Sequence, residues 1–193
     1  YTLNNSPYPA NMEKVYNQTF ANTHAKKLIP SGDLKIVYPA LDKPLAPGAQ
    51  LKAKETQDIP SVTVSSEKIT DESTLYTLIM TDIDASAEGC HYLVTSLQPV
   101  LENNQFVVKN KTVNDQNILE YVAPGPRIEQ NHAYVWLLFK GTPEPSKAQA
   151  DKECRRGYGT NAKDHGAEGY QAASGVGELI AFNYHYVKNA WAK

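Results

Sequence analysis

Near the N-terminus, hydrophobic residues recur at the spacing of a helix. The apolar face consists of Met12, Val15, Tyr16, Thr19 and Phe20. Asn11 precedes this stretch and is a residue type that caps helices well. The pattern predicts an amphipathic helix over residues 11–27, an N-terminal extension to the rest of the chain.

From Leu34 onward the pattern changes to short runs rich in β-branched and aromatic residues, separated by Pro, Gly, Asp and Asn. The strands predicted from these runs are 34–38, 61–65, 74–81, 91–97, 105–109, 118–122, 133–139 and 178–187. Many short strands with few helices between them favour a mostly β fold, an antiparallel β-sandwich with peripheral helices, over a doubly wound α/β fold. The polar, Ala-rich segment from Pro143 to Gly175 predicts one peripheral helix, capped by Ser146 and running through Cys154.

Composition narrows the classes of function. The chain has 193 residues and a formal net charge of -2, with basic residues scattered along it. One ordinary domain over residues 1–193 accounts for this length. A chain without a dense basic run is a poor binder of nucleic acid. No stretch approaches the roughly 18 apolar residues that a transmembrane helix needs, so we expect no transmembrane segment.

Three sequons, at Asn4, Asn17 and Asn110, are compatible with a secreted or extracellular glycoprotein, and a cytoplasmic protein is the alternative. In an oxidising compartment Cys90 and Cys154 could form one disulfide; otherwise they are two free thiols. The chain has no Cys-x-x-Cys spacing, which excludes a metal site of the multi-cysteine kind. We expect no metal and no cofactor.

Two histidines stand at matching places. His91 and His132 each begin an apolar, strand-like run, and Asp82 and Asp84 follow another such run. An imidazole held by a carboxylate tends to donate a hydrogen bond, and two such donors beside backbone N–H groups suit a phosphate or a carboxylate. The pattern favours a small anion site at strand ends. The alternative is that each histidine is a structural, hydrogen-bonded residue.

The loop Ala123-Pro124-Gly125-Pro126 precedes the second histidine. Its prolines make the loop stiff and contribute no donors, whereas Gly125 allows a close approach of the backbone. It is not a Walker loop, because no Gly-Lys-Ser/Thr follows.

Three motifs occur in a characteristic order: Leu75-Tyr76-Thr77-Leu78-Ile79-Met80-Thr81-Asp82-x-Asp84-Ala85, then Tyr121-Val122-x-x-Gly125-Pro126, then His132-x-Tyr134-Val135-Trp136-Leu137. With the His91 strand between the first two, this order resembles the phosphatidylethanolamine-binding protein family over about residues 60–141. The resemblance implies an antiparallel β-sandwich with a small anion-binding cavity, and a single domain of this type.

By matching positions, the resemblance implies that Asp82, His91, Gly125, His132 and Tyr134 line the cavity, with Tyr184 a weaker match from the C-terminal segment. The implied ligand is a phospholipid head group, as in phosphatidylethanolamine, or another small anion. The family also includes inhibitors of serine carboxypeptidases and modulators of kinase signalling. Inhibition of a protease, or binding to a signalling protein, is therefore the alternative function.

The chain departs from the family pattern in several places. The usual Asp-Pro-Asp-x-Pro is Asp82-Ile83-Asp84-Ala85-Ser86, which lacks both stiffening prolines. The segment from Asp84 to His91 is short and lacks aromatic residues. Ala123 stands where glycine is usual, and Ala133 where arginine commonly follows the second histidine.

Enzymes are the competing class. A serine hydrolase would need a strained elbow of the type Gly-x-Ser-x-Gly, and the chain has none. A zinc hydrolase could take His91, His132 and Asp82 as ligands, but the chain has no His-Glu-x-x-His helix. Hydrogen-bonded donors explain the same residues, so we expect a binding protein and no catalytic residues.

Overall fold

The computed structural model describes residues 8–9, 11–22, 28–145, 155–156, 158 and 166–189. Helix α1 spans Met12–Thr19 and buries its apolar face. The predicted helix over 11–27 is confirmed in its first part and wrong at residues 20–22, because the backbone at Phe20 leaves the helical region and residues 21–22 form a turn. Residues 23–27, and the helix predicted from Ser146 through Cys154, lie outside the described residues.

Ten strands and two α-helices make up the described part of the fold. The strands are β1 Asp33–Val37, β2 Ala49–Lys52, β3 Ser61–Ser65, β4 Tyr76–Asp82, β5 Gly89–Leu97, β6 Val100–Glu102, β7 Gln105–Lys109, β8 Gln116–Leu119, β9 Asn131–Lys140 and β10 Leu179–Lys188. A 3-10 turn, η1, covers Ala53–Thr56, and helix α2 covers Ala167–Ser174. The predicted mostly β fold is confirmed.

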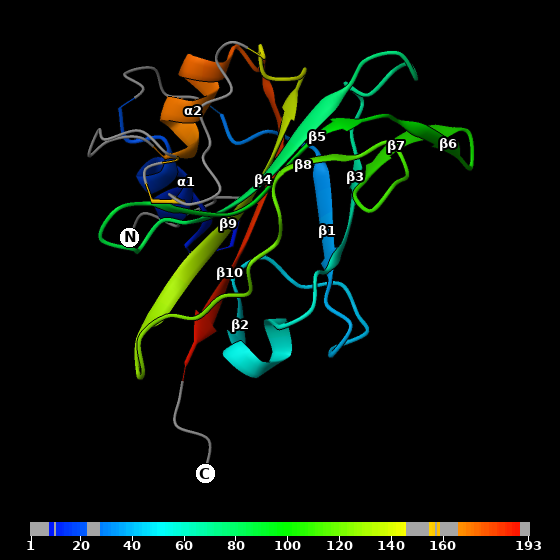
Figure 1. Ribbon diagram of the computed structural model, residues 1–193. Helices are drawn as coiled ribbons and strands as arrows, with labels where there is room; N and C mark the ends of the chain where they lie inside the picture. Colours follow the sequence, from blue (N-terminus) through cyan, green and yellow to red (C-terminus); the bar gives the residue numbers. More distant parts are fainter. Residues whose placement is uncertain are drawn as a thin grey trace, which may run out of the picture.

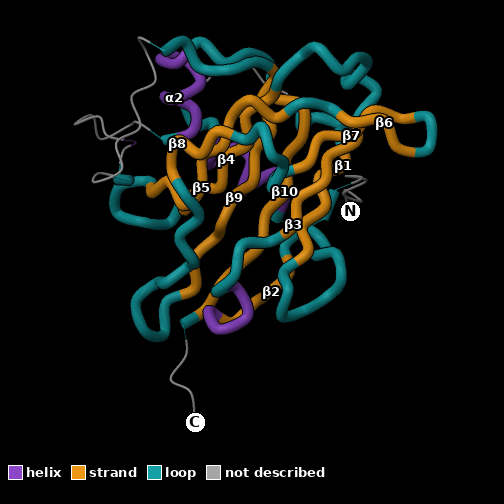
Figure 2. The backbone as a smooth tube through the Cα atoms, turned by 45° about the vertical axis from the view of Figure 1, so that its right-hand side comes forward, coloured by secondary structure: helices purple, strands orange, loops and turns teal. Residues whose placement is uncertain are grey.

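The strands form two sheets. The smaller has the order β1-β3-β7-β6, and the larger has the order β2-β10-β9-β4-β5-β8. All pairs are antiparallel except β2 with β10, which are parallel. Figure 1 shows α1 and α2 on one side of the larger sheet and the smaller sheet on the other, and Figure 2 shows the strands of both sheets as neighbouring layers.

Side chains of a strand alternate between the two faces of a sheet, so the larger sheet takes part in two hydrophobic clusters. On β9, Tyr134, Trp136 and Leu138 pack toward the smaller sheet. The intervening Val135 and Leu137 pack on the other face together with residues of α1 and α2. This alternation decides which polar side chains can meet at the ends of the strands.

Most of the predicted strands match observed ones within a few residues. Two observed strands, β2 and β6, were not predicted, and the run 118–122 is strand only to Leu119. Among the described residues, no helix has the length and apolar character that crossing a bilayer requires. The Asn110 amide is buried and bonds to the main chain at Val62 and Pro60, so the folded protein does not present it as a glycan acceptor.

Candidate functional site

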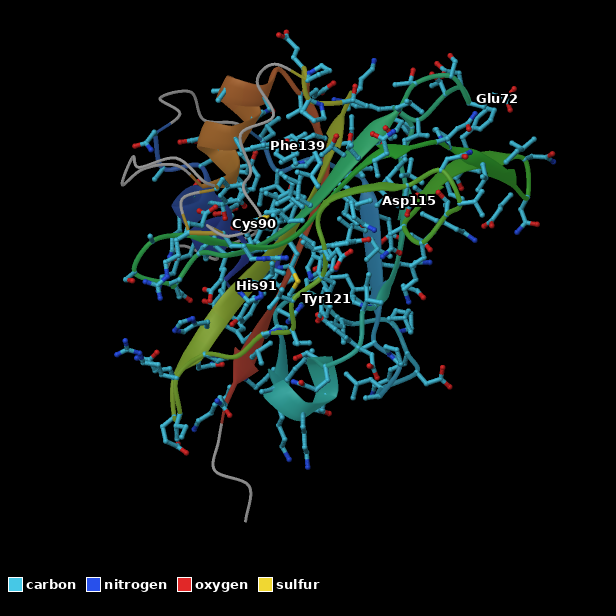
Figure 3. All side chains as sticks on the ribbon, in the orientation of Figure 1. Glu72, Cys90, His91, Asp115, Tyr121 and Phe139 are labelled. Atoms are coloured by element: carbon cyan, nitrogen blue, oxygen red, sulfur yellow. The ribbon has the colours of Figure 1, made fainter. Side chains whose placement is uncertain are left out.

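A cavity of about 530 Å³ lies where β4 ends and where β5 and β9 begin. Five of the six predicted site residues line it: Asp82, His91, Gly125, His132 and Tyr134. Figure 3 shows His91 beside Cys90 on β5, well away from Glu72 at the opposite end of the sheet. Antiparallel pairing explains the meeting, because the end of β4 lies beside the beginnings of both neighbouring strands.

Asp82 organises one wall of the cavity. Its Oδ1 accepts hydrogen bonds from the backbone N–H groups of Asp84, at 3.0 Å, and Ala85, at 3.1 Å. Its Oδ2 accepts one from Nδ1 of His132 at 2.8 Å. The carboxylate thus closes a turn of the kind that Asp commonly forms, and this turn stiffens a loop that lacks the family's prolines.

Asp84 is also fully engaged. Its Oδ2 accepts the backbone N–H of Ala133 at 2.8 Å, and its Oδ1 accepts the side-chain amide of Gln18 at 3.0 Å. Each oxygen of the two aspartates therefore already accepts a hydrogen bond from the protein. The negative charge of these residues is used to hold β9 and α1 against the loop.

His132 presents its second nitrogen to the cavity region. Because Nδ1 donates to Asp82, Nε2 is an acceptor in the neutral ring and a donor in the imidazolium. The Oε1 atom of Gln130 lies 3.2 Å from this Nε2. The side chain is mostly buried, with 15% of its surface exposed, so its ring has a defined orientation at the cavity wall.

His91 is held by the loop that follows β8. Its Nδ1 donates to the carbonyl of Val122 at 2.8 Å, and its own carbonyl accepts the N–H of Val122 at 2.8 Å. Burial lowers the pKa of His91, which outweighs the raising effect of that hydrogen bond and of Asp82. The ring is therefore neutral at pH 7, and its Nε2 is an acceptor rather than a second donor of the kind the sequence suggested.

Tyr134 forms the buried floor of the site. Its ring meets the His91 ring edge to face, with 5.1 Å between centroids. Burial raises the pKa of Tyr134, so the hydroxyl keeps its proton. This hydroxyl is buried and has no partner within ordinary hydrogen-bond distance among the described residues; the Asp82 carboxylate interacts with it from farther away. A buried polar group left unpaired costs about 1–3 kcal/mol, so an acceptor at closer range would stabilise the site.

Three arginines that the sequence did not single out also line the cavity: Arg127, Arg155 and Arg156. Nη1 of Arg155 lies 3.4 Å from the carbonyl of Cys90 and 3.3 Å from that of His91. The backbone carbonyl of Arg155 accepts the N–H of Cys90 at 3.0 Å, which holds this distant segment against β5. The positive charges give the cavity the electrostatics that an anion requires.

Gly125 lines the cavity at a point with no close protein neighbour. A Cβ atom built on this residue would meet no protein atom within 4 Å. The close approach predicted from the sequence is therefore not made to any described part of the protein. The space beside Gly125 belongs to the cavity.

Tyr184, the sixth predicted residue, does not line the cavity. It pairs with Val135 across β9 and β10, and it packs in the cluster on the helix-covered face. Its neighbour His185 pairs with Tyr134 and lies on the same face as that residue. Tyr184 therefore faces away from the cavity, because side chains alternate along a strand.

The remaining reactive groups have structural surroundings. Cys90 is a free, buried thiol, and burial raises its pKa to about 12. Cys154 lies outside the described residues. Within the described part of the chain, no three His, Cys, Asp or Glu side chains are grouped to hold a metal ion. The zinc-hydrolase alternative therefore has no ligand set there.

Comparison with known proteins identifies the family. The model of the phosphatidylethanolamine-binding protein family matches residues 42–184, a span that contains the whole set of predicted site residues. The chain belongs to the phosphatidylethanolamine-binding protein family. The resemblance seen in residues 60–141 thus extends over most of the sequence.

One curated relative is the carboxypeptidase Y inhibitor of Saccharomyces cerevisiae, 26% identical over 196 residues that cover 86% of this chain and 88% of the inhibitor. The crystal structure of carboxypeptidase Y inhibitor complexed with its cognate proteinase has a TM-score of 0.75 at 24% identity, covering 91% of this chain and 92% of the other. A phosphatidylethanolamine-binding protein from Plasmodium vivax has a TM-score of 0.68 at 17% identity, covering 92% and 94%. These structures share the family fold.

Proposed function

We propose that the chain is a binding protein for a small phosphorylated head group of the phosphoethanolamine type, held in the cavity between His91, His132 and Tyr134. The observation that carries the proposal is the Tyr134 hydroxyl, a buried donor with no acceptor within ordinary hydrogen-bond distance among the described residues. A phosphate oxygen would supply that acceptor. Binding of this kind requires no catalytic group.

The electrostatics support the same ligand class. Both aspartates at the cavity have every carboxylate oxygen engaged by protein donors, whereas three arginines line the same space. Nε2 of the neutral His91 is an acceptor, so it suits a ligand that also carries a proton to donate. Phosphoethanolamine combines anionic oxygens with a protonated amine and meets both requirements.

Calorimetric titration of phosphoethanolamine and of inorganic phosphate tests the proposal. Tyr134→Phe removes only the buried hydroxyl, and a hydrogen bond to a charged group contributes about 1.5–3 kcal/mol, so affinity should fall about 10-fold to 150-fold. Tyr184→Phe is the matched control, because it removes the same group from the opposite face of the sheet.

His132→Ala should weaken binding by a similar amount, since it removes the ring that Asp82 orients. Equal affinities for the native protein, Tyr134→Phe and His132→Ala would refute the anion site. A loss in Tyr184→Phe as large as that in Tyr134→Phe would also contradict it.

A second candidate function is inhibition of a serine carboxypeptidase. It is favoured by the relative named carboxypeptidase Y inhibitor, which is similar over most of both chains. The test is the activity of a serine carboxypeptidase at increasing concentrations of this protein. If micromolar protein leaves the activity unchanged while phosphoethanolamine binds to the cavity, the inhibitor candidate is excluded and the binding proposal stands.

A further inference from the structure

A buried polar side chain lies directly behind the floor of the cavity. His185, on β10, is completely buried and pairs with Tyr134 in the register of β10 and β9. It does not line the cavity itself. Its ring lies against the Tyr134 ring in a stacked arrangement, with 6.0 Å between centroids and an angle of 18° between planes.

The hydrogen bonds of His185 fix its state and its orientation. The indole N–H of Trp136 donates to Nε2 of His185 at 3.1 Å. An indole nitrogen can only donate, so Nε2 must be an acceptor and the proton of the neutral ring is on Nδ1. Burial lowers the pKa of His185 to about 3, which keeps the ring in this acceptor form at neutral pH.

Tyr38 connects this ring to the opposite sheet. It follows β1, is completely buried, and places its hydroxyl 3.3 Å from Nε2 of His185. The same hydroxyl lies 3.3 Å from that of Tyr121, which in turn donates to the carbonyl of Thr56 at 2.6 Å. Partners from both sides of the sandwich therefore hold the His185 ring.

Burying a histidine costs more free energy than burying an apolar side chain, so a position that only fills space would not favour it. Among the described residues, the buried Nδ1 of His185 has no partner within ordinary hydrogen-bond distance, and only the backbone of Tyr186 interacts with the ring from farther away. An aliphatic or phenyl side chain would fill a similar volume without an unpaired N–H. What histidine adds is a flat ring whose orientation is set by an acceptor atom.

We propose that His185 is a positioning residue of the anion site, which holds the Tyr134 ring so that its hydroxyl faces the bound phosphate. Tyr134 lies between two rings: His185 stacks on it, and His91 meets it edge to face. Without the stacked ring, Tyr134 gains room to move away from the cavity. This inference rests on the proposed anion site and adds a residue that does not touch the ligand.

A double-mutant cycle with inorganic phosphate as the probe tests the proposal. His185→Leu removes the flat ring and the acceptor, and we expect phosphate affinity to fall about 10-fold. In a protein that already carries Tyr134→Phe, the same replacement should change affinity less than about 2-fold, because it acts through the Tyr134 hydroxyl. Losses that multiply in the double variant would overturn the proposal.

Two further variants separate positioning from general stability. Phe139→Leu replaces a fully buried ring at the far end of β9, on the opposite face, and should lower stability without changing phosphate affinity. His185→Phe keeps a ring but loses the acceptor, so its phosphate affinity should fall only about 3-fold. In the Tyr134→Phe background the same replacement should leave the affinity unchanged. It carries the test if His185→Leu fails to fold.

The outcomes distinguish this inference from the proposed function. If Tyr134→Phe and His132→Ala bind phosphate as the native protein does, the anion site itself is wrong. If Tyr134→Phe weakens binding but neither His185 variant does, the site stands and the positioning role is wrong. A loss in Phe139→Leu equal to that in His185→Leu would also overturn the positioning role, because the effect would then follow stability alone.

Discussion

The two faces of the six-stranded sheet share one backbone but differ in what they bury at the cavity end. On the face toward the smaller sheet, Tyr134 and His185 lie side by side and belong to a polar aromatic cluster. In the adjacent register pair of β9 and β10, Val135 and Tyr184 point to the other face and pack with the helices. The comparison teaches that the proposed binding chemistry lies at one end of the sheet, whereas both faces contribute stability along its length.

Lowering the pH should give the largest of the expected effects, a loss of folding stability that originates at His185 on the face toward the smaller sheet. The folded protein keeps His185 neutral, because burial lowers its pKa to about 3, whereas the unfolded chain protonates it near 6.5. Since the unfolded state binds the additional proton, this contribution to stability is complete above pH 6.5 and decreases as the pH falls toward 3, by up to about 5 kcal/mol.

Urea denaturation in neutral and in mildly acidic buffer measures this effect. His185→Gln removes the titrating group, so its unfolding free energy should decrease less between the two buffers than that of the native protein. If both proteins lose the same amount, the acid sensitivity comes from other groups.

A core replacement on the opposite face should affect stability and leave binding intact. Phe139 is completely buried in the helix-side cluster, and replacing a buried Phe by Ala typically costs about 3–5 kcal/mol. We expect Phe139→Ala to lower the midpoint of urea unfolding while calorimetry gives an unchanged phosphate affinity. A parallel loss of affinity would mean that the two faces are not independent.

Two glycines give the smallest and most selective comparison. An added methyl group at Gly125 meets only cavity space, so Gly125→Ala should change stability by less than about 0.5 kcal/mol and weaken phosphate binding about 3-fold. An added methyl group at Gly32 clashes with the backbone carbonyl of Ile180, so Gly32→Ala should lower stability and spare affinity. Thermal unfolding and calorimetry on both variants check the contrast. The reverse pattern would place the cavity elsewhere.

The sequence predicted strands best where burial was strongest. All seven residues of β4 are buried, and its continuous apolar run was evident from the sequence. The strands β2 and β6 have only four and three residues and bury one side chain between them, so a hydrophobic pattern is too short to identify either. Helix α1 was predicted too long, because polar residues after Phe20 are compatible with a helix as well as with the turn that forms.

The site was predictable only as far as local patterns reach. Asp82, His91 and His132 stand at the ends of clear apolar runs, which is why sequence reasoning could group them. Arg155 reaches β5 across 64 residues of sequence, and only the tertiary fold shows that contact. That Tyr184 packs on the helix-covered face follows from the register of β10 against β9, which no property of the isolated strand reveals.

The Cys90 thiol gives the protein an internal reporter of opening next to the cavity. Alkylating reagents attack the thiolate, and a pKa of about 12 leaves almost none of it in the folded protein at neutral pH. Modification at this residue must therefore await a transient separation of β5 from its surroundings. A ligand that bridges β5 and the neighbouring loop would slow that reaction. Peptide mapping after timed alkylation would therefore follow the occupancy of the cavity without any label on the ligand.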